Sequence, residues 1–125
     1  MQTEDVDGKT LETWTPQEVS DAMGKGEIVL IDVRTPQEYM IDHIEGALLM
    51  PLSDFVPGAL PTGGDKRLVF YCGSGVRSGK VSRMVLSDGA DKVAHMEGGM
   101  AGWKQAGLPH VQVDMATGAP KKSGS

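Results

Sequence analysis

The 125-residue chain has a formal net charge of −5, and 39% of its residues are hydrophobic. This length fits one domain with an ordinary hydrophobic core, which needs neither a disulfide nor a metal to be stable. The acidic balance argues against a general nucleic-acid binder, and no apolar stretch approaches the ~20 residues that a membrane span needs. We therefore expect neither nucleic-acid nor membrane partners.

The two ends of the chain are polar. Residues 1–10 are acidic and unlike a signal peptide, which predicts a disordered N-terminal segment. Residues 113–125 are small, rich in Gly and Pro and basic near the end, which predicts a flexible C-terminal tail after a domain at 11–112. The single cysteine, Cys72, suits a reducing compartment and favours the cytoplasm, although an exported protein without its signal would look the same.

Between these ends, short apolar runs alternate with helix signals. The tetrapeptide Thr-Pro-Gln-Glu occurs at 15–18 and again at 35–38, and each copy has the residues of a capping box with Pro at the first helical position. The apolar runs at 27–34 and 67–72 are typical of strands buried on both faces. Alternating strands and helices predict an α/β fold with a parallel, doubly wound sheet. Strands are expected at 12–14, 27–34, 47–52, 67–72 and 92–97, and helices at 16–23, 36–42, 76–88 and 98–107.

Cys72 lies where such a fold places its ligands, at the carboxyl end of a buried parallel strand and just before a helix. The segment that follows, Gly73-Ser74-Gly75-Val76-Arg77-Ser78, can curl its backbone N–H groups into an anion-binding nest, and the helix adds its positive end. These groups favour a thiolate at Cys72, which would be a nucleophile inside a cup of hydrogen-bond donors. The alternative, an inert buried thiol, does not explain the sequence that follows it.

The histidines give no sign of a metal site or of a Cys–His pair. His43, His95 and His110 are scattered, and none neighbours Cys72 in the sequence. A Cys–His pair would need the fold to bring one of them close, and we interpret His95 and His110 as structural. With one cysteine and no ligand spacing, neither a metal nor another cofactor is expected.

Three segments together resemble the single-domain rhodaneses, the thiosulfate sulfurtransferase family. "YCGSGVRS" (71–78) is similar to the family's active-site loop, and "LIDVRTPQEYMIDHIEGALLMPL" (30–52) and "HMEGGMAGWKQAGLP" (95–109) are similar to its two other signatures. The resemblance covers roughly residues 11–110 and implies a five-stranded parallel sheet with helices on both faces. One departure is Asp42, which stands where the family usually has Gly; a left-handed backbone there would cost about 1 kcal/mol.

The resemblance also implies a chemistry. Cys72 would accept a sulfane sulfur from thiosulfate, a polysulfide or a persulfide, and would pass it to a thiol or to cyanide. The backbone from Gly73 to Ser78 would cradle the persulfide, and Arg77 would contact the anionic substrate. Asp32 and Arg34 are expected to support the loop, with Arg34 paired to Glu38 or to Asp32.

Two alternatives stay open. Phosphatases and arsenate reductases of the same fold have five residues between Cys and Arg, whereas four separate Cys72 from Arg77 here. The shorter loop favours a sulfur atom over a tetrahedral phosphate, which needs donors around three equatorial oxygens. The other alternative is a non-enzymatic carrier that hands its persulfide to a protein acceptor.

Overall fold

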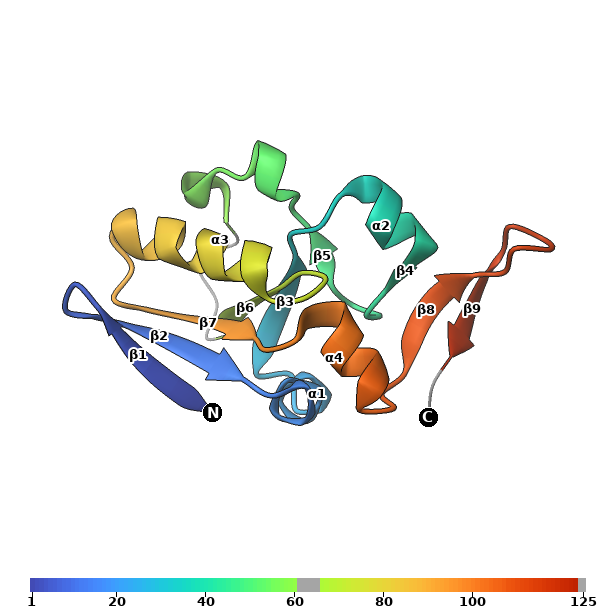
Figure 1. Cartoon of the computed structure of the whole chain (residues 1–125), viewed down its shortest axis with the longest axis horizontal. Helices are drawn as coiled ribbons and strands as arrows, with labels where there is room; N and C mark the ends of the chain where they lie inside the picture. Colours follow the sequence, from blue (N-terminus) through green and yellow to red (C-terminus); the bar gives the residue numbers. More distant parts are fainter. Residues whose placement is uncertain (61–65, 124–125) are drawn as a thin grey trace.

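The computed structural model describes residues 1–60 and 66–123. Its main sheet has six strands in the order β1-β2-β7-β6-β3-β5 (Figure 1). The strands are β1 (Gln2–Val6), β2 (Lys9–Trp14), β3 (Ile28–Asp32), β5 (Leu48–Leu49), β6 (Arg67–Tyr71) and β7 (Lys92–Met96). All neighbours from β2 to β5 are parallel, which confirms the predicted five-stranded parallel sheet.

The sixth strand, β1, was not expected, because residues 1–10 were predicted to be disordered. It pairs with β2 in antiparallel register through a two-residue turn at Asp7 and Gly8, which have φ angles of 52° and 83°. Asp-Gly is a strong signal for such a hairpin, since both positions need a positive φ. The polar composition of the segment concealed this signal, because the side chains of β1 are mostly exposed and need not be apolar.

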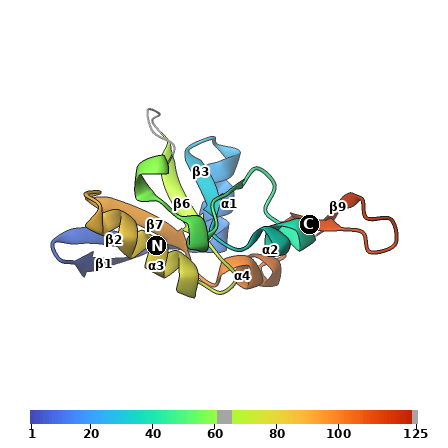
Figure 2. The ribbon, with the colours of Figure 1, turned by 90° about the horizontal axis from the view of Figure 1, so that it is seen from above.

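A second, smaller sheet joins β4 (Asp42–His43), β8 (His110–Val113) and β9 (Pro120–Ser123), which pair in antiparallel register. The β8–β9 hairpin extends away from the main sheet in both views (Figures 1 and 2). The whole of β9 falls in the segment 113–125 that was predicted to be a flexible tail, so this prediction was wrong for β9; residues 124–125 lie outside the described part of the chain. Its backbone pairing with β8 needs no apolar side chains, so composition did not reveal it. The domain bounds 11–112 stay a prediction.

The described residues contain four α-helices, α1 (Pro16–Gly24), α2 (Pro36–Ile41), α3 (Val76–Ser87) and α4 (Gly99–Gln105), with two short 3₁₀ helices at Leu52–Asp54 and Pro57–Ala59. Helix α2 lies against β4 and β8 of the smaller sheet, and the other three α-helices cover the main sheet. Side chains alternate along the central strands, so that Leu30 and Val69 pack with α1 and α4, while Ile31 and Phe70 pack with α3. Helices therefore lie on both faces, as predicted. None of the helices in the described residues has the length and the apolar run that crossing a bilayer requires.

Both predicted capping boxes are present. The Thr15 hydroxyl accepts from the amide of Glu18 at 3.1 Å while the Glu18 carboxylate accepts from the amide of Thr15 at 2.9 Å. Thr35 and Glu38 make the same two bonds at 3.1 and 3.0 Å. Helix α2 ends at Ile41, and the following residue, Asp42, has a φ of −158°, which is extended backbone. Asp42 does not adopt the left-handed conformation considered for this position, so the energetic cost of about 1 kcal/mol does not arise.

Helix α4 holds the backbone that follows β6. The amide of Met100 donates to the carbonyl of Cys72 at 2.7 Å, and the amide of Ala101 donates to the carbonyl of Gly73 at 3.1 Å. This approach requires glycine at position 99, where φ is +56° and a Cβ would lie 2.2 Å from the Cys72 carbonyl oxygen. The contact fixes the start of the loop that follows Cys72.

Gly99→Ala should destabilise the protein by more than the cost of placing alanine in a left-handed conformation. Gly26 is the matched control, because its φ is +68° and a Cβ there meets nothing within 4 Å. We expect Gly26→Ala to cost about 1–2 kcal/mol in the free energy of unfolding. Gly99→Ala adds a collision with backbone and should cost at least about 2 kcal/mol more. Equal costs in urea denaturation would show that the α4 contact is loose.

Candidate active site

The loop after β6 surrounds the sulfur of Cys72 with donors. The Cys72 Sγ accepts from the amide of Gly75 at 3.0 Å and from the amide of Ser78 at 3.3 Å, and it lies 3.7 Å from the Ser78 hydroxyl. Gly75 is left-handed, with φ of 107°, and caps α3, so its conformation turns the loop back towards the sulfur. Cys72 itself is fully buried.

The pKa of Cys72 is lowered from its ordinary value of 9. Burial of the thiol raises its pKa, but hydrogen bonds from the backbone and hydroxyl of Ser78 and from the amides of Ser74 and Gly75 outweigh this effect. A group that is stabilised by donors in its charged form is held in that form. The predicted cup of donors is thus present around Cys72, and it favours the thiolate.

A chain of polar side chains continues behind the sulfur. The Ser78 hydroxyl lies 2.9 Å from Nδ1 of His95, and Nε2 of His95 lies 3.3 Å from the hydroxyl of Thr13. Burial lowers the pKa of His95, with a smaller contribution from Arg83, so its ring is neutral at pH 7. Our sequence analysis interpreted His95 as structural and did not predict this contact. The contact depends on β6 and β7 being neighbours in the sheet, and the sequence of a strand does not show which strand lies beside it.

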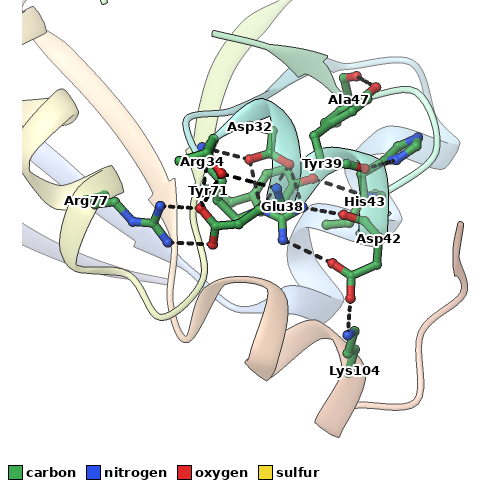
Figure 3. Close-up of polar contacts among 12 residues, drawn as sticks. Asp32, Arg34, Glu38, Tyr39, Asp42, His43, Ala47, Tyr71, Arg77 and Lys104 are labelled. Carbon is green, nitrogen blue, oxygen red and sulfur yellow. Dashed lines mark hydrogen bonds and ion pairs between the residues drawn. The ribbon is translucent and has the colours of Figure 1, made fainter. Parts of the chain in front are cut away.

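Arg77 is held by a carboxylate from another helix. Its guanidinium makes a bidentate ion pair with Glu38 of α2, with distances of 2.6 Å from Nη1 to Oε1 and 3.0 Å from Nη2 to Oε2 (Figure 3). The hydrogen bond from Arg77 lowers the pKa of Glu38 to about 2. Glu38 pairs with Arg77 and not with Arg34, which was one of the two pairings considered for Arg34. The role of Arg77 as an anion contact stays a prediction.

Asp32 and Arg34 form a buried network at the end of β3, the strand beside β6, where Asp32 lies opposite Tyr71. Arg34 donates to both carboxylate oxygens of Asp32, the shortest contact being 2.8 Å, and also to the side chain of Asp42 at 3.1 Å (Figure 3). Its guanidinium lies 5.6 Å from the ring centre of Tyr71, the residue before Cys72. Asp42 also pairs with Lys104 of α4. Burial, together with Asp32, raises the pKa of Tyr71, so its hydroxyl stays protonated, and the hydroxyl oxygen accepts from the amide of Ile44 at 3.2 Å.

The remaining predicted residues lie around this core of the site. Gly73 is tied to α4 through its carbonyl, Ser74 exposes its side chain, and Val76 is 65% exposed at the first turn of α3. The structure therefore brings Cys72, Gly75 and Ser78 together through direct contacts. In residues 1–60 and 66–123, no group of three or more His, Cys, Asp or Glu side chains could hold a metal ion.

The chain belongs to the rhodanese-like domain family, whose model matches residues 15–106. It is 38% identical over 104 residues to the uncharacterized protein slr1261 of Synechocystis, covering 83% of this chain and 58% of that protein. It is also 38% identical over 104 residues to the probable adenylyltransferase/sulfurtransferase MoeZ of Mycobacterium tuberculosis, covering 79% of this chain and 26% of MoeZ. The chain thus spans about half or less of the length of these curated relatives.

Solved structures share the fold. A rhodanese-related protein from Thermoplasma volcanium superposes with a TM-score of 0.70 at 24% identity, covering 80% of this chain and 97% of that one. A protein from Rhodopseudomonas palustris described as a possible tyrosine phosphatase superposes with a TM-score of 0.65 at 29% identity, covering 78% of this chain and 83% of that one.

Removing the Ser78 hydroxyl should raise the pKa of Cys72. The hydroxyl stabilises the thiolate, so its loss in Ser78→Ala should move the pH midpoint of alkylation by iodoacetamide upwards by about half a unit to one unit. At pH 7 the reaction should then be slower than in the wild type. Ser74→Ala is the control, because its exposed side chain is lost while its backbone amide remains. An unchanged midpoint in Ser78→Ala would mean that the amides alone set the pKa.

Breaking the Arg34 network should be costly because Asp32 is fully buried. Arg34→Leu leaves this carboxylate without its partner, and we expect a loss of about 3–5 kcal/mol in the free energy of unfolding. The control is Arg83→Leu, which removes an exposed pair with Glu4 and should cost at most about 1 kcal/mol. If the two variants unfold at the same urea concentration, the network does not stabilise the carboxyl ends of β3 and β6.

Proposed function

We propose that the protein is a sulfurtransferase that carries a sulfane sulfur on Cys72. The observation that supports this function best is the pair of amides, from Gly75 and Ser78, that donate to the Cys72 sulfur at 3.0 and 3.3 Å. Donors aimed at one buried sulfur stabilise negative charge there, first on the thiolate and then on the persulfide. Membership of the rhodanese-like family, and a relative named as a sulfurtransferase, point to the same chemistry.

The reaction consists of two displacements at sulfur. The Cys72 thiolate attacks the outer sulfur of thiosulfate or of a persulfide; a new S–S bond forms, and the old one breaks with its electron pair leaving on sulfite or on a thiolate. The Cys72 persulfide then gives its outer sulfur to cyanide or to a thiolate, and the Cys72 thiolate is restored. No general base is needed if the thiolate is already formed.

Access to the sulfur requires movement. Cys72 has no exposed surface, so a donor reaches it only when the atoms that cover it shift. The network of Asp32 and Arg34 lies beside the end of β6 and contacts Tyr71, the residue before Cys72. It would hold that residue in place during such a shift.

The proposal includes several donors and acceptors. The donor is thiosulfate, a polysulfide or a persulfide, and the acceptor is cyanide, a small thiol or a protein. A dedicated carrier would load once and release its sulfur only to a partner, whereas an enzyme would turn over with small molecules. A cytoplasmic location is also part of the prediction.

Phosphoryl transfer is the competing activity, because one structure of the same fold is described as a possible tyrosine phosphatase. The four-residue spacing from Cys72 to Arg77 argues against it. The engagement of Arg77 by Glu38 argues against it as well, since a phosphate dianion needs that guanidinium. A phosphatase assay with p-nitrophenyl phosphate distinguishes the two activities.

Intact-mass measurement tests the proposal. After incubation with thiosulfate or an organic persulfide, the wild type should gain the mass of one sulfur atom, and cyanide should remove it with release of thiocyanate. Cys72→Ser should gain nothing. If no donor loads the wild type while p-nitrophenyl phosphate is hydrolysed, the assignment to sulfur transfer is wrong.

A further inference from the structure

Glu38 makes one contact that its counterpart in the first Thr-Pro-Gln-Glu segment does not make. Glu18 and Glu38 stand at the same position of identical tetrapeptides and close the same capping box. The carboxylate of Glu18 additionally meets only the chain's amino terminus, at 2.9 Å. The carboxylate of Glu38 reaches a side chain of the loop that follows Cys72. The role of Glu38 in capping helix α2 therefore does not explain its ion pair with Arg77.

The ion pair of Glu38 with Arg77 lies against the loop backbone. A Cβ built on Gly73, the residue after Cys72, would be 3.1 Å from Arg77 Nη2 and 3.9 Å from Glu38 Oε2. Both side chains are about one-third exposed, at 34% and 36%. The pair thus lies between solvent and the residue that follows Cys72, on the side of the loop that faces α2 (Figure 3).

Arg77 and Glu38 offset each other's charge beside the loop. The carboxylate of Glu38 pairs with the guanidinium of Arg77, which lies against Gly73. In the neighbouring network, Asp32 and Asp42 offset Arg34 and Lys104. The thiolate of Cys72 is held by hydrogen-bond donors, and none of these three cations is left without a carboxylate partner to attract a second anion. A donor that approaches the thiolate meets repulsion that grows with the donor's own negative charge.

We propose that Glu38 is a specificity-determining residue, which neutralises Arg77 and so makes Cys72 select organic persulfides, with at most one negative charge on sulfur, over the dianion thiosulfate. The proposal rests on the proposed sulfurtransferase function and names the class of donor. If Glu38 were absent, Arg77 would be free to bind the sulfonate oxygens of thiosulfate, as guanidinium groups bind other tetrahedral anions.

Glu38→Gln tests the proposal with little change in shape. The amide oxygen of Gln can still accept from the amide of Thr35, because Glu and Gln both serve in a capping box. The matched control is Glu18→Gln, which makes the same change in the same motif away from the loop. The measurement is the second-order rate constant of Cys72 persulfide formation, by intact mass, with thiosulfate and with 2-hydroxyethyl persulfide, whose only ionisable group is its sulfur.

In Glu38→Gln the ratio of the thiosulfate rate constant to the persulfide rate constant should rise about tenfold, which corresponds to about 1.4 kcal/mol. The ratio should stay at the wild-type value in Glu18→Gln. The rise should shrink at high ionic strength, because the pair is partly exposed and salt screens it. An unchanged or lower ratio in folded Glu38→Gln would overturn the proposal.

Arg77→Gln supplies a second test if Glu38→Gln does not fold. It leaves the charge of Glu38 unbalanced, so the same ratio should fall below the wild-type value; a ratio that does not fall would overturn the proposal. These outcomes differ from a failure of the proposed function. In that case neither donor would load the wild type, whereas here the wild type loads with the persulfide and only the selectivity is in question.

Discussion

The site depends on the direction of two backbone amides. Those of Gly75 and Ser78 point at one sulfur atom at the end of β6, and they hold the pKa of Cys72 below its ordinary value although the thiol is buried. Backbone donors need no side-chain ordering when charge develops, because the fold has already fixed them. The loop conformation is therefore the property that the surrounding structure has to preserve.

Three elements preserve it from different sides. Helix α4 binds the carbonyls of Cys72 and Gly73, and the close approach demands glycine at position 99. The network centred on Arg34 packs against Tyr71, so the residue before Cys72 is held by buried charge. The hydroxyl of Ser78 is held by His95 from the neighbouring strand. Each contact joins segments far apart in the sequence, which makes the geometry of the loop a property of the whole fold.

Contacts between residues close together in the sequence could be predicted, and contacts between distant residues could not. Both capping boxes and the donors around Cys72 are formed within a few residues of the chain, and their patterns predicted them. The pair of Arg77 with Glu38 spans 39 residues and the contact of Ser78 with His95 spans 17, and neither can be inferred without the order of the strands and the placement of α2. The β1–β2 hairpin is different. The Asp7-Gly8 dipeptide is a hairpin signal that the sequence contains, but we gave more weight to the polar composition around it and predicted disorder.

The two edges of the main sheet are closed to further strands. At one edge, β1 covers β2 and exposes the charged side chains of Glu4, which pairs with Arg83, and Asp5, so a second chain would meet charged groups before it met free backbone groups. At the other, β5 has only two residues, which is too short to act as a template for pairing. Exposed strand edges promote aggregation, and charge and shortness are two ways in which proteins prevent it. A unit with such edges can be concentrated without sheets merging from one copy to the next.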